Sequence, residues 1–416
     1  MSLESEIRAG LERAREGARR LALCSGATRN LLLTKLADAL RQQSDAIVAA
    51  NARDLEAARQ GGLRGAMLER LSLDRRRIEA MAQGVEEVAA LPDPVGEVIA
   101  GWRRPNGLEI RQVRVPIGTI AVIYESRPNV TVDAAALLLK AGNAAVLRGG
   151  KEALHTNSLL AQLIAGAIDQ AGAPAQALFF VATAEREVVQ ILKRSADLLQ
   201  LIIPRGGGAL KGALQASAVP VLPHFDGICH VYVDRAAEIA QALAICVDAK
   251  TSRPSVCNAM ENLLVHQEIA ARFLPTLGEK LRALGVELRG CPRTRAIIAA
   301  AAASEEDWDR EYLDLILSIK IVDSLSDAID FIARHGSGLA DAIVTADYET
   351  ACRFQHEVDS ATVYVNASTR FTDGFEFGFG AETGISTNRL HARGPMGLRE
   401  LTTYKYAIWG QGQVRG

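Results

Sequence analysis

The sequence predicts an α/β protein with two α/β domains, each built on a parallel sheet, and a small β arm. Strands alternate with helices of about ten to fifteen residues in two stretches of the chain, which is the pattern of βαβ units. A hairpin signal precedes the first of these stretches. The length of 416 residues suits two or three domains and a large buried core.

The first ninety or so residues are expected to form helices, because apolar side chains recur there at helical spacing. Ile7, Leu11 and Ala14 share one helix face. The arginine run at 75–77 is interpreted as a solvated helix face rather than a nucleic-acid patch. Prolines in the segment 91–94 end the helical region, since proline cannot continue the hydrogen-bond ladder.

A two-stranded unit follows the helices. Residues 98–102 and 108–115 flank Pro105-Asn106-Gly107, and Asn-Gly is a strong signal for a hairpin turn. The apolar residues of this unit do not alternate cleanly, so it is expected to be an arm or a sheet edge. A late, isolated strand is expected at 401–409.

The two alternating stretches predict two parallel sheets, whose ligands usually bind at the carboxyl ends of the strands. Strands of the first are expected at 119–124, 144–147, 178–181 and 198–203. Strands of the second are expected at 229–233, 262–265, 315–322, 342–344 and 362–365.

Composition and charge exclude several classes of protein. The net charge of -2 gives no electrostatic reason to expect a nucleic-acid partner. No apolar run reaches the roughly 18 residues of a membrane span, and the acidic start lacks the layout of a signal peptide. We therefore expect a cytoplasmic protein without a membrane partner. The six cysteines are scattered without a C-x-x-C pair, so neither a disulfide framework nor a metal site is predicted.

Two glycine-rich turns follow strands of the first stretch: Arg148-Gly149-Gly150-Lys151 and Pro204-Arg205-Gly206-Gly207-Gly208. Neither matches a Walker A loop or G-x-G-x-x-G. Each alone is consistent with a tight turn that needs positive φ. Together, with a cation beside each, they favour a cofactor that carries phosphate.

Cys257 is the candidate nucleophile. It follows a loop broken by Pro254, stands near Lys250 and Arg253, and precedes an apolar strand. Nearby cations favour the thiolate, which is the reactive form of the side chain. The other five cysteines lie mostly in apolar or helical settings, where an inert buried thiol is expected, and the same reading remains open for Cys257 itself.

Several long blocks stand in order along nearly the whole chain. They are VPIG at 115–118, YESRPNVTVD at 124–133, IIPRGG at 202–207, HFDGICH at 224–230, RPSVCNA at 253–259, VNASTRFTDG at 365–374, and GIST at 384–387 with HARGPMGL at 391–398. In these blocks the chain resembles the γ-glutamyl phosphate reductases, also called glutamate-5-semialdehyde dehydrogenases, of the aldehyde dehydrogenase superfamily.

The resemblance implies the aldehyde dehydrogenase fold. Residues 1–102 and 116–230 would form an NADPH-binding domain, and residues 231–395 a catalytic domain. Residues 103–115 and 396–416 would form an oligomerisation arm. The chain is therefore expected to be a homo-oligomer.

The resemblance also implies a reaction. NADPH would reduce γ-L-glutamyl 5-phosphate to L-glutamate 5-semialdehyde, with release of phosphate, on the route to proline. Cys257 would form a thioester, and the Asn129 side chain with the Cys257 N–H would stabilise the oxyanion. The E-L-G-G-K segment of hydrolytic aldehyde dehydrogenases is absent, which fits a thioester that must not be hydrolysed.

The same resemblance suggests ligand-binding residues. Arg148 and Lys151, with Gly149 and Gly150 between them, would meet the 2′-phosphate, and Gly206 and Gly207 the pyrophosphate or nicotinamide. Glu311 aligns with a glutamate that holds the nicotinamide ribose, although a plain surface position remains open. The cations expected at the substrate's phosphate or α-carboxylate, and the hydroxyl donors beside them, are Arg127, Arg370, Ser368 and Thr369.

Two positions depart from the family pattern: Leu339 stands where a His is usual, and Ser252 where Gln is frequent. Two other functions remain open. One is an aldehyde dehydrogenase that uses coenzyme A, and the other is an inactive scaffold, against which the intact Cys257, Asn129 and Arg370 blocks speak. An association with glutamate kinase is also considered.

Overall fold

The structure is a computed structural model that describes residues 2–125, 127–206, 208–222 and 227–415. It separates into two compact units. The first comprises Met1–Pro223, Gly378–Gly384 and Met396–Gly416, and the second His224–Phe377 and Ile385–Pro395. Each unit is an α/β structure with a parallel sheet, as the sequence predicts.

Five helices open the first unit, and side-chain caps define where three of them begin. Ser2, Ser25 and Asp74 each accept a hydrogen bond from a backbone N–H of the first helical turn. The helices are α1 (Leu3–Leu21), α2 (Gly26–Gln42), α3 (Ser44–Gln60), α4 (Ala66–Leu71) and α5 (Arg75–Ala90). The predicted helical region is thereby confirmed.

The sheet of the first unit has four parallel strands in the order β5-β4-β3-β6. Its strands are β3 (Thr119–Tyr124), β4 (Ala144–Arg148), β5 (Leu178–Phe180) and β6 (Leu201–Arg205). Its connecting helices are α6 (Asn129–Lys140), α7 (Leu154–Gln170) and α8 (Glu187–Arg194), followed by α9 (Gly208–Ala213), with short 3-10 turns at Lys151–Ala153 and Ala175–Ala177.

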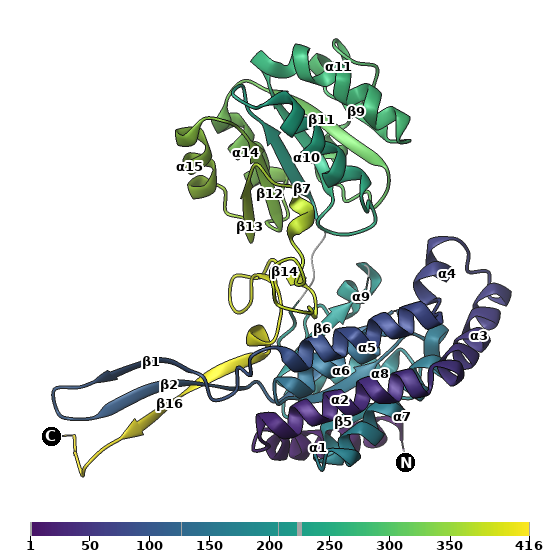
Figure 1. Ribbon diagram of the computed structural model, residues 1–416, viewed down its shortest axis with the longest axis vertical. Helices are drawn as coiled ribbons and strands as arrows, with labels where there is room; N and C mark the ends of the chain where they lie inside the picture. Colours follow the sequence, from purple (N-terminus) through teal and green to yellow (C-terminus); the bar gives the residue numbers. More distant parts are fainter. Residues whose placement is uncertain (1, 126, 207, 223–226, 416) are drawn as a thin grey trace. The chain divides into compact units, whose positions relative to one another are not determined.

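Helices cover both faces of this sheet (Figure 1). Helices α6 and α7 pack together on one face, and α2, α3 and α5 pack on them in turn. Helices α1 and α8 pack together on the other face, where Leu11, Ala121, Val146 and Leu192 belong to one buried cluster. Because both faces are covered, β3 is buried at every position.

An antiparallel three-stranded sheet forms the arm (Figure 1). Strand β2 (Glu109–Pro116) lies between β1 (Val98–Arg103) and β16 (Thr402–Trp409), which follows a 3-10 turn at Arg399–Leu401. The predicted hairpin and late strand are thus confirmed and belong to one sheet. Trp102 and Tyr406 meet edge to face across it, and both side chains are exposed.

The second unit has a seven-stranded parallel sheet in the order β10-β9-β11-β8-β7-β12-β13. The strands are β7 (Cys229–Val233), β8 (Met260–His266), β9 (Glu287–Gly290), β10 (Ala301–Ala302), β11 (Ile316–Val322), β12 (Ala340–Val344) and β13 (Thr362–Val365). The helices are α10 (Ile239–Thr251), α11 (Gln267–Ala283), α12 (Pro292–Arg295), α13 (Glu305–Trp308), α14 (Leu325–His335) and α15 (Tyr348–Glu357). A 3-10 turn at Thr369–Phe371 and the short pair β14 (Ile385–Ser386) and β15 (Gly394–Pro395) complete it.

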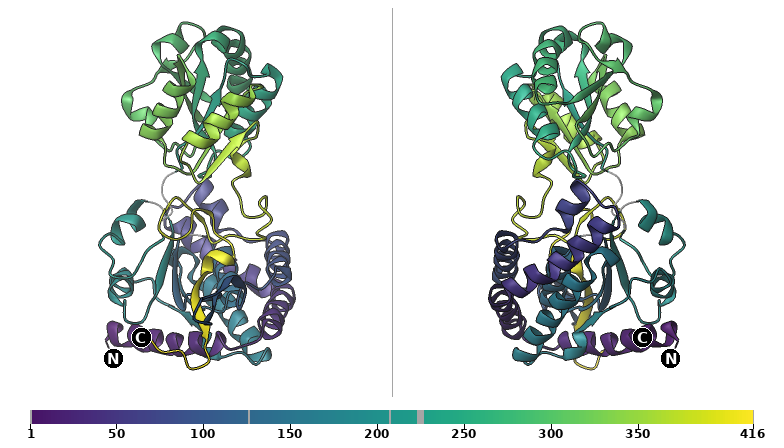
Figure 2. Two further views of the ribbon diagram at one scale, coloured as in Figure 1. Left: turned by 90° about the vertical axis from the view of Figure 1, so that its left-hand side faces the viewer. Right: turned by 90° about the vertical axis from the view of Figure 1, so that its right-hand side faces the viewer.

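Helices also cover both faces of this larger sheet (Figure 2). Helix α10 packs on α11, and α14 packs on α15. The chain moves along the sheet in one direction through α10 and α11 and in the other through α14 and α15, so right-handed crossovers put the two pairs on opposite faces.

Candidate active site

In the first unit, the sequence-predicted cofactor residues meet at one edge of the sheet. The turns after β3, β4 and β6 lie at the carboxyl ends of adjacent parallel strands, where Ile123 pairs with Arg148 and Tyr124 with Arg205. Successive strands run from β3 toward β5, and the chain then returns to place β6 on the other side of β3. The crevice beside such a reversal is the usual ligand site of an open α/β sheet.

Arg148 ends β4 and is only partly exposed. Its guanidinium donates to the carbonyl of Ala184 at 2.8 Å, and burial lowers its pKa. Among the described residues its Nε finds no hydrogen-bond acceptor, although this atom is buried. The Lys151 side chain, in the next turn, is exposed. The edge thus holds a buried donor without an acceptor beside a solvent-facing cation, which suits an anionic ligand.

The glycines of these turns bring backbone close to other groups. A Cβ on Gly149 would lie 2.2 Å from the Asn157 amide nitrogen, so no side chain fits there. Asn157 Nδ2 is also buried without an acceptor among the described residues. Gly150 and Gly206 lie in the turns after β4 and β6, and Gly207 lies outside the described residues. The residues present therefore fit a phosphate-bearing cofactor.

Asn129 is the first residue of α6 and not part of a turn. Its amide Nδ2 donates to the Asp133 carboxylate at 2.8 Å, one helical turn further on. Burial raises the pKa of Asp133 to about 6, against the opposing effects of that hydrogen bond and the charge of Arg205. The Asp133 carboxylate therefore fixes which way the Asn129 amide points. Arg127 precedes this helix in the same unit.

In the second unit, Cys257 lies in the turn between α10 and β8, at the amino edge of the sheet. Gly227, just before β7, packs directly on it: a Cβ on Gly227 would lie 1.8 Å from the Cys257 carbonyl oxygen. The buried Cys229 thiol donates to the same oxygen at 3.3 Å. Cys257 also packs against an apolar cluster that includes Leu339, so the unusual leucine forms part of the wall beside the thiol.

Lys250 does not supply a spare positive charge to Cys257. Its ammonium is fully buried and lies 2.6 Å from the equally buried Glu261 carboxylate. The expected activation of the thiol by Lys250 is therefore corrected, since the pair has no net charge. Arg253, the other expected cation, is exposed, and its effect on the thiol remains a prediction.

Glu311 lies in the segment before β11, also at the amino edge. Its Oε1 accepts a hydrogen bond from the Gly227 N–H at 2.8 Å. Because Gly227 packs on Cys257, the Glu311 carboxylate lies close to the segment 252–259 that carries Cys257, here called the nucleophile loop. A role in holding a ribose remains a prediction.

The segment after β13 returns to the same loop. Arg370 donates to the side chains of Asn258 and Ser252, next to Cys257. Burial and the charge of Arg253 lower the pKa of Arg370, while the charges of Asp248 and Asp373, and then the thiol of Cys257, oppose this. Arg370 therefore lies within electrostatic reach of both Arg253 and Cys257.

The two hydroxyl residues of this segment are buried. Thr369 donates its proton to the Asn258 carbonyl at 2.7 Å, and Ser368 accepts from the Arg370 N–H at 3.3 Å. Thr369 therefore braces the nucleophile loop in this structure, and contact of either hydroxyl with substrate remains a prediction. The structure brings Cys257, Glu311 and residues 368–370 together within one unit, whereas Asn129, Arg127 and the residues at 148–151 belong to the other.

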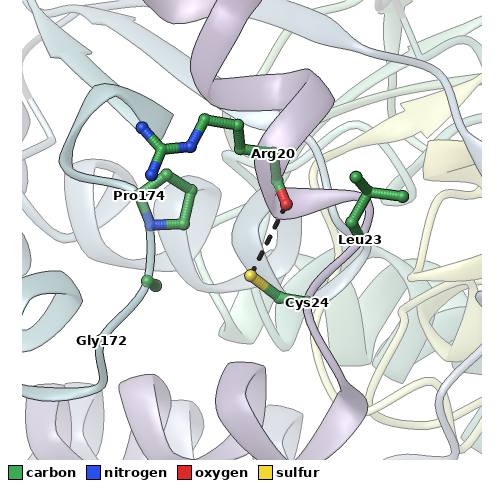
Figure 3. Close-up of a pocket in the computed structure, with 6 residues that line it drawn as sticks. Arg20, Leu23, Cys24, Gly172 and Pro174 are labelled. Carbon is green, nitrogen blue, oxygen red and sulfur yellow. Dashed lines mark hydrogen bonds between the residues drawn. The ribbon is translucent and has the colours of Figure 1, made fainter.

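An open pocket of about 300 Å³ lies elsewhere in the first unit (Figure 3). It lies between the end of α1 and the segment before β5, hence at the amino edge of that sheet and not among the predicted ligand residues. Inside it, the Cys24 thiol donates to the Arg20 carbonyl at 3.6 Å. No helix of the described residues is both long and apolar enough to cross a membrane.

Comparison with known proteins gives the class. The sequence model of the Aldehyde dehydrogenase family matches residues 2–310 and 294–407. The chain therefore belongs to the aldehyde dehydrogenase family, whose members are oxidoreductases that take a nicotinamide cofactor.

Several individual relatives share one name, gamma-glutamyl phosphate reductase. The chain is 54% identical to a gamma-glutamyl phosphate reductase of Moorella thermoacetica and 51% identical to one of Clostridium novyi, over the full length of each. It is similar to the crystal structure of a gamma-glutamyl phosphate reductase from Thermotoga maritima, with a TM-score of 0.97 and 45% identity. That match covers 99% of this chain and 100% of the other.

Sequence reasoning missed Asp133, Gly227 and Glu261 as parts of the site. Glu261 had a visible signal, because it is an acidic residue inside an otherwise apolar strand that is buried on both faces. Asp133 is spaced four residues from Asn129, the distance at which helix side chains meet. The close approach of Gly227 to Cys257 depends on tertiary packing and has no sequence signal beyond the glycine itself.

Proposed function

We propose that this chain reduces γ-L-glutamyl 5-phosphate to L-glutamate 5-semialdehyde with NADPH, and so serves proline biosynthesis. One observation carries the proposal: Arg370 hydrogen-bonds the side chain of Asn258, the residue after Cys257, and its pKa responds to the charges of Arg253 and Cys257. An acyl phosphate needs a nucleophile at its carbonyl and cations at its phosphate, within a few ångströms of each other. The names of the full-length relatives support the same substrate.

The chemistry proceeds by covalent catalysis at Cys257. The thiolate attacks the γ-carbonyl, the carbon–oxygen bond to phosphate breaks, and inorganic phosphate leaves with the electron pair. Arg253 and Arg370 stabilise the negative charge on that leaving group. When bound, NADPH supplies the hydride that takes the thioester to the aldehyde level. Loss of the aldehyde returns the thiolate.

Both additions to the carbonyl create an oxyanion. We assign its stabilisation to the Asn129 amide and the Cys257 N–H, each contributing about 3 kcal/mol, as such donors do in other enzymes. Because one Asn129 N–H is donated to Asp133, the other is left for the oxyanion. Arg127 is assigned to the α-carboxylate of the substrate.

NADPH is favoured over NADH by the cations after β4. Lys151 is exposed there and is assigned to the 2′-phosphate. The Arg148 guanidinium already donates to the carbonyl of Ala184, so we propose that Arg148 holds the turn after β4 in place. Its Nε–H, which has no acceptor among the described residues, would donate to the cofactor phosphate. Arg186, whose charge acts on Arg148, is the next candidate.

The reverse reaction provides the decisive test. Purified enzyme with glutamate 5-semialdehyde and NADP⁺ is expected to form NADPH only when inorganic phosphate is present. Turnover that requires coenzyme A in place of phosphate would indicate the related thioester-forming dehydrogenases. Absence of turnover with either acceptor would favour an inactive scaffold.

We also propose that the arm joins copies of the chain, in the cytoplasm, and that glutamate kinase is a further partner. An isolated small sheet is marginally stable, and its outer strands expose unpaired edges. Trp102, Tyr404, Tyr406 and Trp409 are all exposed on it. Removing 104–109 is expected to lower the mass of the particle in solution, measured by light scattering. A monomeric wild-type protein at micromolar concentration would refute the idea.

A further inference from the structure

The base of the nucleophile loop carries a buried ion pair that the reaction itself does not use. Lys250 lies in the last turn of α10, and Glu261 is the second residue of β8. Cys257 lies in the segment between them. The 2.6 Å contact between ammonium and carboxylate therefore closes this segment into a loop, with both side chains fully buried.

Glu261 also holds a second loop. Its other oxygen, Oε1, accepts the backbone N–H of Leu313 at 3.3 Å. Leu313 adopts a φ of 55°, a left-handed conformation that is unfavourable for a residue with a side chain and needs support from its surroundings. Two residues earlier stands Glu311, whose carboxylate binds the Gly227 N–H against Cys257.

The backbone of β8 is irregular where Glu261 occurs. Cys229 pairs with Met260 and His230 with Asn262, so β8 has one extra residue relative to β7, and that residue is Glu261. A bulge of this kind re-aims a side chain, and bulges are frequent beside active sites.

A buried ion pair is a weak source of stability. Burial lowers the pKa of Lys250 and raises that of Glu261 to about 7, so both charges are held against a desolvation cost. Well-packed apolar residues of similar volume are often as stabilising as a buried ion pair, or more so. We propose that Lys250 and Glu261 are positioning residues. The Glu261 carboxylate fixes the loop that carries Cys257 through Lys250, and the loop that carries Glu311 through the Leu313 N–H. This inference rests on the proposed role of Cys257 as the nucleophile.

The test compares two ways of removing the pair with a control. In Lys250→Met/Glu261→Met the charges and the acceptor for Leu313 are lost while the volume is kept. Glu261→Gln keeps an oxygen for Leu313 and loses the charge. Leu277→Ala, at a fully buried residue of α11 outside both loops, lowers stability. Each variant is measured for Tm, kcat, the KM of both substrates, and the rate of Cys257 alkylation by iodoacetamide.

We expect the double variant to keep its Tm within a few degrees and to lose about a hundredfold in kcat, as small displacements of a catalytic group do. Its alkylation rate should change about tenfold, and Glu261→Gln should be intermediate. Leu277→Ala should lower Tm and leave kcat within about twofold. Wild-type kcat and alkylation in the double variant would overturn the proposal.

A double variant that does not fold leaves the decision to Glu261→Gln. If this variant loses Tm but keeps kcat and the alkylation rate, the pair is merely structural. Alkylation needs no substrate, so it separates the two ideas. A changed alkylation rate in an enzyme without turnover on glutamate 5-semialdehyde would refute the proposed substrate and retain the positioning pair.

Discussion

The two sheets present their candidate residues at opposite ends of their strands. In the first unit these residues follow β3, β4 and β6 at the carboxyl edge, where backbone N–H groups, glycines and cations suit a bound phosphate. In the second unit Cys257 and Glu311 precede β8 and β11 at the amino edge, where side chains are held by buried partners, and residues 368–370, which follow β13, return to the Cys257 loop. The difference indicates that binding a large cofactor needs open backbone, whereas presenting one nucleophile needs a braced loop.

The largest effect is expected from the nucleophile itself. Cys257→Ser should reduce turnover by more than about a thousandfold, because a serine hydroxyl lacks the thiolate's reactivity at neutral pH. NADPH binding, measured by fluorescence titration, should be unchanged, since the residues predicted to bind its phosphates belong to the other unit and the substitution leaves Glu311 in place. Near wild-type turnover, or substrate protection of another cysteine from alkylation, would contradict the assignment.

A pair of glycine variants tests the division of labour between the edges. Gly227→Ala places a Cβ against the Cys257 carbonyl, so we expect about a hundredfold loss of kcat and a much smaller change in cofactor affinity. Gly149→Ala places a Cβ against Asn157 and should instead weaken cofactor binding. Both variants would be measured by stopped-flow turnover and fluorescence titration. If each variant impaired kcat and cofactor affinity equally, the two edges would not have separate roles.

The two cations after β4 should behave differently. Lys151→Ala is expected to lower kcat/KM for NADPH by about ten- to a hundredfold and that for NADH much less, since only NADPH carries the 2′-phosphate. Arg148→Ala should impair both cofactors, because its guanidinium also supports the backbone at Ala184. An unchanged NADPH/NADH ratio in the double variant would move the 2′-phosphate site to Arg186.

A smaller effect, on stability, is expected at Asp133. Its pKa is raised to about 6, so the folded state binds a proton more tightly than the unfolded state does. This favourable contribution is fully present below about pH 4 and is lost as the pH rises through 6. Asp133→Asn cannot ionise, so it should raise Tm by a few degrees at pH 8 and by less near pH 4. Equal shifts of Tm at both pH values would show that burial does not raise the pKa of the Asp133 carboxylate.

The sequence alone predicts the helices and strands that have a strong apolar pattern. It does not predict those whose structure depends on packing against neighbouring elements. The buried strands β3 and β7 were predicted because both read as apolar runs. Strand β9 was not predicted, because its sequence Glu-Leu-Arg-Gly has no such run and its neighbour β11 holds it in the sheet. Helix α6 begins at Asn129, because Pro128 fixes a helical φ just before it.

The candidate site shows the same limit. Cys257 could be selected by its loop, and the glycine-rich turns at 148–151 and 204–208 by their chemistry, whereas Asn129, Glu311 and the substrate residues were predicted only through the family resemblance. The charge state around the thiol could not be predicted, because Lys250 finds its partner eleven residues further on, across a turn. Local sequence shows which charges are near in the chain, while only the fold shows which of them cancel.

The first unit is discontinuous, and this has a consequence for synthesis. Strand β16 pairs with β2 along its whole length, and Arg114 bonds to Thr402 across 288 residues of chain. At about 5–20 residues per second, a ribosome needs on the order of 15–60 s to make the intervening chain. The second unit can fold within that interval, while the β1–β2 hairpin waits with an open edge. Nascent chains paused before β16 should therefore be the ones most exposed to edge-to-edge aggregation.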